Sequence, residues 1–291
     1  MFNPFSWFGH HDEGSFVNVP ILDNFYQTSS FFPMPVLLMT TIAENGQTNV
    51  APYSLCFPHV ISGKHAMMLI ARGSSNTAQN ILRTGLAAIN FIPDDKEYLK
   101  CCVELGFPGE TTEEKMKHSI FHLLSSQRDN KIDGIIYPEI LEEAVQVFEC
   151  SWDSSHPYMV NELEYHFLLT VDKIVMKEKW KKALADGGSF PSLPVDYGYR
   201  DNMHFWFSPF KDPYPFDIPK DKKQDVNTVH YQAERIDPEV KWDIEASEKL
   251  VRVPCVFLKK VLTQIVEEAK KRGISLVTAD LLDEIRAKQK R

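Results

Sequence analysis

The stretch Pro35-Val-Leu-Leu-Met-Thr-Thr-Ile-Ala-Glu-Asn-Gly46 decides how the fold begins. Its part from Val36 to Ala43 is apolar and β-branched, which is typical of a buried strand. Glu44-Asn-Gly46 then predicts a tight hairpin turn, because Asn-Gly tolerates the positive φ angles that such turns need. The segment Thr48-Asn-Val-Ala-Pro-Tyr-Ser54 is therefore expected to return beside the first strand.

Further strands are expected along the chain, with helices between them. The strands are predicted at His65–Ala71, Leu86–Ile92, Val145–Cys150 and Glu164–Lys177. A short helix lies within Arg72–Gly85, which ends at a glycine stop signal. Residues 94–145 are expected to be mostly helix and loop, with Thr111 and Glu114 at capping-box spacing. Several strands with one helical excursion indicate a mainly β fold, a barrel with inserted helices.

The chain is expected to have four parts. Residues 1–30 form an N-terminal arm, in which His10 and His11 have no third metal ligand at a recognisable spacing. Residues 31–207 form the barrel, whose strands lie between about 30 and 175. Residues 208–241 are rich in proline and charge, which favours an extended linker. Residues 242–291 are expected to form a small helical C-terminal domain.

The helical tail shows an amphipathic pattern followed by clear stop and start signals. Gly273 ends the first helix and Thr278 caps a second one. The expected apolar face of the first helix consists of Val256, Phe257, Val261, Ile265, Val266 and Ala269. A unit of roughly 50 residues is marginally stable alone, so it is expected to pack on something else.

Composition excludes several classes of protein. The chain is 43% hydrophobic and 25% charged, which is ordinary for a globular protein with a sizeable core. Its net charge of −8, without a long basic block before the tail, argues against nucleic acid as a partner. Apolar stretches are too short for a membrane span, and no signal peptide is evident. Five scattered cysteines favour buried thiols in a reducing cytoplasm over a disulfide framework.

The start of the predicted short helix is the most suggestive chemical feature. Arg72, Ser74, Ser75 and Thr77 surround a helix N-terminus, where unpaired N–H groups and partial positive charge favour a phosphate. Ser and Asn also cap helices in general, so these residues alone leave a plain helix start open. The strand before it adds small residues that let a flat ring approach the backbone, and Ser54 offers a hydroxyl to a polar edge.

The order of these motifs resembles the flavin reductase-like family of FMN-binding split barrels. The resemblance covers roughly half the chain and extends to Val147-Phe-Glu-Cys150 and the His166 strand. The matching motifs are the first strand and its Asn-Gly turn, Asn49-x-Ala51-x-x-Ser54, Ser75-Asn-Thr77-x-x-Asn80-Ile81, and Thr84-Gly85 before an Ile-Asn-Phe strand.

This resemblance implies FMN at the interface of a homodimer. Asn49, Ala51 and Ser54 would line the ring and the ribityl chain. The phosphate would be held by Arg72, Ser74, Ser75 and Thr77, and the loop supported by Asn80. His166 matches a family position near the flavin, although a strand histidine satisfied by its neighbours is an equally open interpretation.

The tail resembles the small C-terminal domain of light-independent protochlorophyllide reductase. The resemblance rests on Glu245-Ala-x-x-x-Leu250-x-x-Val253-Pro254, a helix, Ala269-x-x-x-Gly273-Ile274 and a final helix after Thr278. In that family the module accompanies redox enzymes near a tetrapyrrole. No residue role is assigned to this tail, which is expected to be a docking module, a lid or a structural appendage.

The expected function is an FMN-binding oxidoreductase that takes hydride from NAD(P)H and reduces free flavin or a redox protein partner. The cofactor carries the chemistry, so neither a catalytic side chain nor a metal is assigned. Arg200 is the candidate contact for the nicotinamide phosphate, within an aromatic segment that either covers the flavin or packs in the core. Two alternatives remain open: a non-catalytic FMN-binding or electron-relay protein, and a barrel that binds heme or another tetrapyrrole.

Overall fold

The structure is a computed structural model that describes residues 15–61, 64–156, 158–161, 163–186, 189–199, 204–209, 213–214 and 225–289. Its principal sheet is formed by β2 (Leu37–Ile42), β3 (Thr48–Tyr53), β4 (Cys56–Val60), β5 (Ala66–Arg72), β6 (Leu86–Phe91), β9 (Gln146–Trp152), β10 (Tyr158–Asn161) and β11 (Glu164–Met176). The strands run in the order β3-β2-β6-β9-β11-β5-β4, and β10 pairs with β11 at the side. Every pairing in this sheet is antiparallel.

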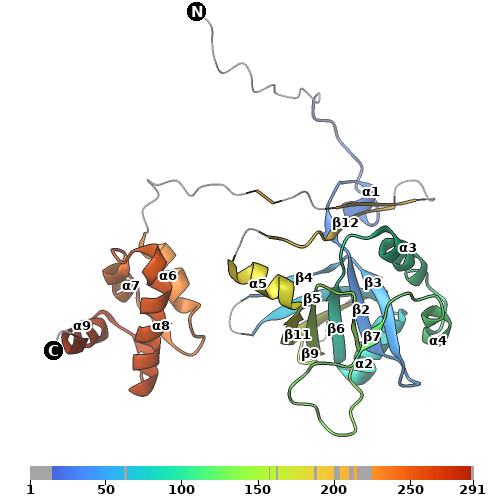
Figure 1. The fold of residues 1–291 in the computed structure, drawn as a ribbon. Coiled ribbons are helices and arrows are strands. Elements are labelled where there is room, and N and C mark those ends of the chain that lie inside the picture. Colours follow the sequence, from blue (N-terminus) through green and yellow to red (C-terminus); the bar gives the residue numbers. More distant parts are fainter. Residues whose placement is uncertain are drawn as a thin grey trace, which may run out of the picture.

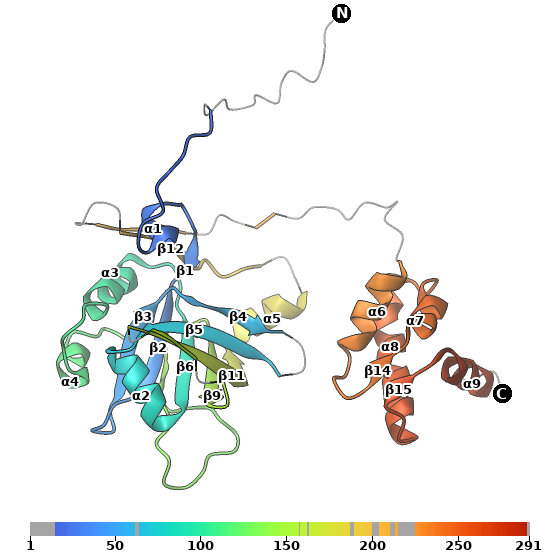
Figure 2. The ribbon, with the colours of Figure 1, turned by 180° about the vertical axis from the view of Figure 1, so that it is seen from behind.

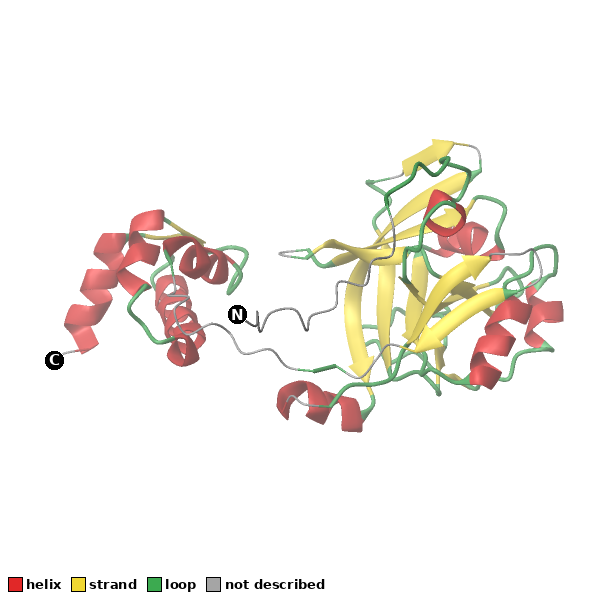
Figure 3. Cartoon of the chain, turned by 90° about the horizontal axis from the view of Figure 1, so that it is seen from above, coloured by secondary structure: helices red, strands yellow, loops and turns green. Residues whose placement is uncertain are grey.

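The sheet curls because its two edge strands are consecutive in the chain. Only Ser54 and Leu55 separate β3, at one edge, from β4 at the other. Leu55 also accepts a backbone hydrogen bond from Ile70 of β5, at 2.9 Å. Such a short connection brings the two edges together, and Figure 3 shows the strands wrapping around a common centre. The predicted barrel is therefore confirmed.

The first hairpin forms as the Asn-Gly signal predicts. Ala43 donates to the carbonyl of Gln47 and Gly46 donates to Ala43, which closes the turn between β2 and β3. Gly46 has a φ of 83°, a conformation that glycine adopts without a steric penalty. The register pairs Met39 with Ala51 and Thr41 with Asn49, so these cross-strand partners share one face of the sheet.

Helices cover the barrel from two sides. α2 (Asn76–Thr84) contacts β2, β3, β5 and β6, whereas α3 (Lys96–Leu105) and α4 (Thr112–Met116) contact β3. Figure 2 shows α2 at the barrel and α3 with α4 on its flank. Buried Ala78 and Ile81 of α2 join the cluster inside the barrel, which includes Met39, Leu69 and Phe167. The predicted capping box of Thr111 and Glu114 is present at the start of α4.

A smaller sheet lies beside the barrel and contacts the N-terminal segment. It consists of β1 (Met34–Pro35), β12 (Pro194–Tyr199) and β13 (Phe205–Pro209), in the order β1-β12-β13. α1 (Phe25–Thr28) contacts β12. The remaining elements of this half are the short pair β7 (Leu123–Leu124) and β8 (Ile140–Leu141), and the helix α5 (Glu178–Asp186).

The C-terminal residues form a second buried core. Its elements are α6 (Val226–Glu234), β14 (Lys241–Trp242), α7 (Ile244–Leu250), α8 (Cys255–Lys271), β15 (Leu276–Val277) and α9 (Ala279–Gln289), which Figure 1 draws in orange and red. The two short strands pair in parallel. Leu258, Leu262 and Ala269 of α8 are fully buried in this core together with Trp242 and Leu282.

Two expectations for this region are wrong in detail. The linker predicted over 208–241 contains α6, and Val229, Ala233 and Val240 are buried in the C-terminal core. The proline content of the segment conceals a short amphipathic run that begins at the Asp225 cap. The predicted face of α8 is also shifted, because Phe257 is exposed and Leu258 and Leu262 are buried in its place.

Candidate functional site

The barrel closure places the end of β3 next to the start of α2. Tyr53, the last residue of β3, has its phenol oxygen 3.2 Å from Oγ of Ser75, which precedes α2. The two motifs singled out in the sequence, the Asn49–Ser54 strand and the Arg72–Asn80 helix start, therefore meet in space. We refer to this junction of β3 and the α2 N-terminus as the β3–α2 site.

Ser75 is the N-cap of α2, and its hydroxyl is fully used. It donates to the carbonyl of Arg72 at 2.8 Å and accepts the N–H of Ala78 at 3.1 Å. A serine hydroxyl has one proton and two acceptor positions. Since that proton is directed at Arg72, the phenol of Tyr53 must donate to Ser75. Ser75 thus positions the helix start rather than offering a free hydroxyl to a ligand.

Thr77 supplies a buried hydroxyl in the first turn of α2. Its side chain is 1% exposed, and Oγ1 has no hydrogen-bond partner of normal geometry among the described residues. The hydroxyls of Ser75 and Thr77 and the charge of Arg72 lower the pKa of Tyr53, but burial outweighs them and raises it. The N–H groups of this first turn have no acceptor within the helix. A helix start with an unsatisfied hydroxyl is a fitting site for a phosphate.

Asn49 contributes a second unsatisfied polar atom on β3. The residue is fully buried, and its Oδ1 accepts a hydrogen bond from Thr112 of α4 at 3.1 Å. Its Nδ2 is buried and has no hydrogen-bond partner in the described part of the chain. A buried amide donor without a partner costs free energy, so such atoms frequently mark a missing ligand group.

Asn80 and Ser54 take structural positions around these groups. Asn80 is buried, donates to Thr41 of β2 at 3.1 Å and accepts from Arg83 at 3.3 Å. It therefore ties α2 to β2. Ser54 lies at the bend between β3 and β4 and is half-buried, while Ala51 is a buried small residue in the middle of β3.

Arg72 and Ser74 stand at the open side of the helix start. Both are exposed, Arg72 at the end of β5 and Ser74 in the turn before α2. Arg72 is registered opposite Glu164 of β11. The pKa of Tyr26 in α1 is raised by burial and by the carboxylates of Asp196 and Glu164, and lowered by Arg72.

His166 lies on β11, the strand that pairs with β5 and places Glu164 opposite Arg72. His166 is registered opposite Ile70 on β11, and its neighbour Phe167 points into the barrel interior. Because side chains alternate along a strand, His166 faces the opposite side of the sheet from the interior, the side on which Glu164 and its partner Arg72 also lie. Arg200 lies outside the described residues.

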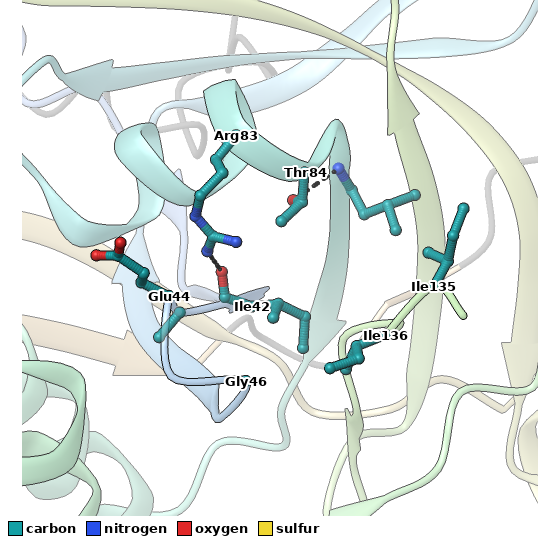
Figure 4. A pocket seen from close by; sticks show the side chains of 9 residues that line it. Ile42, Glu44, Gly46, Arg83, Thr84, Ile135 and Ile136 are labelled. Carbon is teal, nitrogen blue, oxygen red and sulfur yellow. Dashed lines mark hydrogen bonds between the residues drawn. The ribbon is translucent and has the colours of Figure 1, made fainter.

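A cavity of about 310 Å³ lies at the other end of α2. It is lined by the first hairpin, by Arg83 and Thr84, and by Ile135 and Ile136. Figure 4 shows Arg83 directed at the carbonyl of Ile42 on its wall. None of the predicted cofactor-binding residues lines this cavity, so it is distinct from the β3–α2 site.

Other kinds of site find less support in the described part of the chain. It contains no group of three or more His, Cys, Asp or Glu side chains arranged to hold a metal ion. His10 and His11 lie outside the described residues. No helix in the same residues is long and apolar enough to cross a membrane. Cys56, Cys101, Cys102 and Cys150 are buried free thiols, as predicted.

Comparison with solved structures defines the class of fold. The chain resembles 2-nitrobenzoate 2-nitroreductase of Pseudomonas fluorescens with a TM-score of 0.53 and 15% identity, over 71% of this chain and 98% of that one. Flavoredoxin of Methanosarcina acetivorans aligns with a TM-score of 0.51 and 15% identity, over 72% and 98%. Nitrilotriacetate monooxygenase component B of Bacillus cereus aligns with a TM-score of 0.51 and 17% identity, over 69% and 100%.

These likenesses establish a split β-barrel of the flavin reductase kind with inserted helices. They lie at sequence identities where the fold is shared and the activity is not thereby transferred. No protein-family model matches the sequence, and comparison with curated proteins finds no similar sequence.

Sequence reasoning missed three residues that build the site. Tyr53 lies within the quoted β3 motif, and Thr41 and Thr112 bond to Asn80 and Asn49. Thr41 is opposite Asn49 in the hairpin register, so the Asn-Gly turn carried a signal for it. Thr112 is 63 residues away from Asn49, and nothing local in the sequence indicates that contact.

Proposed function

We propose that the protein binds FMN at the β3–α2 site and acts as an NAD(P)H-dependent oxidoreductase that reduces flavin or a partner acceptor. The observation that supports this most is the pair of unsatisfied buried polar atoms, Asn49 Nδ2 and Thr77 Oγ1, on two elements that Tyr53 and Ser75 hold together. One is suited to a polar ring edge or ribityl hydroxyl and the other to a phosphate. FMN carries both kinds of group.

In this proposal, different residues bind the phosphate and the ring with its ribityl chain. The first-turn N–H groups of α2, Thr77, Ser74 and Arg72 form the proposed phosphate cradle. Asn49, Ala51 and Ser54 line the proposed ring and ribityl side, where the small Ala51 leaves the strand backbone accessible. Ser75 and Asn80 do not contact FMN in this proposal. Ser75 caps the start of α2, and Asn80 holds α2 against β2.

When bound, FMN supplies the redox chemistry by accepting hydride from a nicotinamide and passing electrons onward. The protein's own part is to orient the cofactor and exclude competing reactions. The likeness to a flavoredoxin and to a monooxygenase component B favours a small redox protein or flavin as the acceptor. We further propose a homodimer, because the β3–α2 site is open to solvent at Arg72 and Ser74 on the single chain.

The first experiment compares Arg72→Gln with Lys100→Gln in the full-length protein. Both positions carry exposed cations, but Lys100 is on α3 and is not one of the residues assigned to the cradle. Loss of a charge-assisted phosphate contact is worth roughly 1.5–3 kcal/mol, so Arg72→Gln is expected to weaken FMN binding by about 10- to 100-fold. Lys100→Gln is expected to leave FMN affinity within about twofold. Flavin fluorescence quenching measures both, and equal affinities in the two variants contradict the assigned cradle.

The second experiment separates a reductase from an electron relay. The FMN-loaded protein is mixed anaerobically with NADH or NADPH, and the visible flavin absorbance is followed. Bleaching by one of the nicotinamides supports the reductase. A flavin that binds but stays oxidised with both nicotinamides contradicts the NAD(P)H-dependent activity and leaves the FMN-binding proposal standing.

A further inference from the structure

The segment before α1 is an apolar arm that the described residues of its own chain leave uncovered. We define the arm as residues 15–24. In the arm, the side chain of Phe16 is fully exposed and that of Ile21 is 86% exposed. The other exposed apolar residues of the arm are Val17, Val19 and Leu22. Figure 1 shows the segment leading from the barrel outward, in dark blue.

The arm is unusual in charge as well as in exposure. Residues 15–32 contain a single charged residue, Asp23, in a protein of net charge −8. Exposed segments of soluble proteins are normally polar, and contiguous apolar surface marks a contact with another molecule. Two copies of a chain this acidic repel one another, so a contact between copies is favoured where charge is absent.

The base of the arm is fixed, which gives the arm a definite origin. Leu22 donates its N–H to the hydroxyl of Ser29 at 3.0 Å. The side chain of Gln27 in α1 lies on Gly198 of β12, where a Cβ would be only 2.4 Å from Gln27 Cδ. Gly198 has a φ of 75°, a conformation that favours glycine. The arm therefore leaves the molecule beside the sheet β1-β12-β13.

That sheet carries an apolar surface of its own. Trp206 on β13, its outer strand, has a half-exposed side chain on one face of the sheet, whereas its neighbour Phe205 points to the other face and stacks with Phe207. Ten residues of extended chain reach about 33 Å, which is enough to cross from one copy to such a sheet on the next. The arm together with Phe25 and Phe32 of the segment that follows it exposes on the order of 1,000 Å² of apolar side chain, against about 800 Å² per partner in a stable interface.

We propose that the arm of each copy packs on the sheet β1-β12-β13 of a second copy, around Trp206, and that this exchange builds the homodimer. The arm and the sheet lie next to each other in each chain. A twofold axis can therefore place the arm of each copy on the sheet of the other copy, as in an isologous interface. The inference deepens the homodimer proposed above and does not require bound cofactor.

The test is the oligomeric state of full-length variants without cofactor, by sedimentation velocity over a range of concentrations. The arm variant is Phe16→Asp with Val19→Asp and Ile21→Asp. These side chains are exposed on the single chain, so the changes leave the barrel core intact. The wild type is expected to be a dimer, and the arm variant is expected to raise the dimer dissociation constant by at least about 100-fold, since three buried apolar side chains are lost.

A matched control carries the same number of new charges elsewhere. Ile132→Asp with Ile174→Asp and Leu184→Asp changes three exposed apolar side chains outside the arm, and it is expected to remain a dimer. Trp206→Ser is expected to weaken the dimer. Combined with the arm variant it is expected to raise the dissociation constant little further, because both changes remove the same contact. A dimeric arm variant, a control that dissociates equally, or strictly additive effects of the two changes would each overturn the assignment.

A wild type that is monomeric contradicts both the homodimer and the arm exchange. FMN binding is measured separately on the same samples. A dimer that binds no FMN therefore contradicts the proposed function alone, and an FMN-binding dimer whose arm is dispensable contradicts this inference alone.

Discussion

At the scale of single residues, the site depends on the fact that a hydroxyl group has one proton and can donate only one hydrogen bond. Ser75 gives its proton to Arg72 and accepts from Ala78 and Tyr53. Tyr53 is therefore the link between the end of β3 and the start of α2. Its phenol is buried and its pKa is raised, so it stays a neutral donor throughout the physiological range.

This link predicts a coupled loss of stability. Ser75→Ala removes the N-cap and is expected to cost about 1 kcal/mol in the free energy of unfolding. Tyr53→Phe leaves the ring in place and is expected to cost about 0.5–1.5 kcal/mol. Because the two changes remove a shared hydrogen bond, the double variant should cost less than their sum.

Urea unfolding of the full-length variants measures these costs. Tyr98→Phe is the matched control, since that hydroxyl makes no hydrogen bond with the described residues and its ring packs on Phe121. It is expected to be nearly neutral. Strictly additive effects of Tyr53→Phe and Ser75→Ala would show that the assigned hydrogen bond is not formed.

A second residue-scale prediction concerns pH. His122 Nδ1 lies 2.6 Å from a carboxylate oxygen of Glu143, and the hydrogen bond with this carboxylate raises the pKa of His122 above 6.5. A raised folded-state pKa gives stability that is fully present below about pH 6.5 and is lost as pH rises through the raised value. His122→Gln is expected to flatten that dependence between pH 5.5 and 8.5. His118→Gln is the control, and an unchanged pH profile in His122→Gln would contradict the contact.

At the scale of elements, α2 is set by its two ends. Ser75 starts it and Gly85 ends it in the left-handed conformation, with a φ of 69°. No atom lies within 4 Å of a Cβ added at Gly85, so the cost of a substitution there is the backbone strain alone. Gly85→Ala is expected to destabilise the protein by roughly 1–2 kcal/mol in urea unfolding. An unchanged midpoint would mean that the C-cap relaxes without cost.

Elements that are encoded in a short stretch of sequence were predicted well, and elements that depend on contacts with distant residues were not. The hairpin at Gly46, the caps at Ser75 and Thr111, and the apolar strands follow from short stretches of sequence. β4 was missed because Cys56–Val60 shows a mostly exposed, proline-interrupted pattern and is held by pairing with β5. α6 was missed because its burial depends on partners that follow it in the chain, such as Trp242.

The placement of α6 in the C-terminal core yields a prediction for that unit. Val229 is fully buried there, and Val229→Ala removes two methyl groups from the core. At about 0.8 kcal/mol per buried CH₂ plus a cavity term, the expected cost is about 2 kcal/mol. Hydrogen exchange of the full chain should then speed up across 241–289 and stay unchanged in β2 and β6. Faster exchange confined to α6 would contradict a shared core.

At the scale of the whole molecule, the sequence predicted the barrel because the motifs come in a fixed order. These motifs form one site only because the sheet closes and brings β3 beside the start of α2. Contacts such as Thr112 with Asn49 depend on that closure and have no local signature.

The central claim is that one chain holds one FMN at the β3–α2 site. The most direct measurement is an FMN titration of the full-length protein, followed by visible absorbance and flavin fluorescence, beside Thr77→Val and the control Thr263→Val. We expect a yellow protein with one FMN per chain, and an FMN affinity that is about tenfold weaker without the Thr77 hydroxyl and unchanged in the control. A protein that stays colourless and takes up no FMN would contradict it.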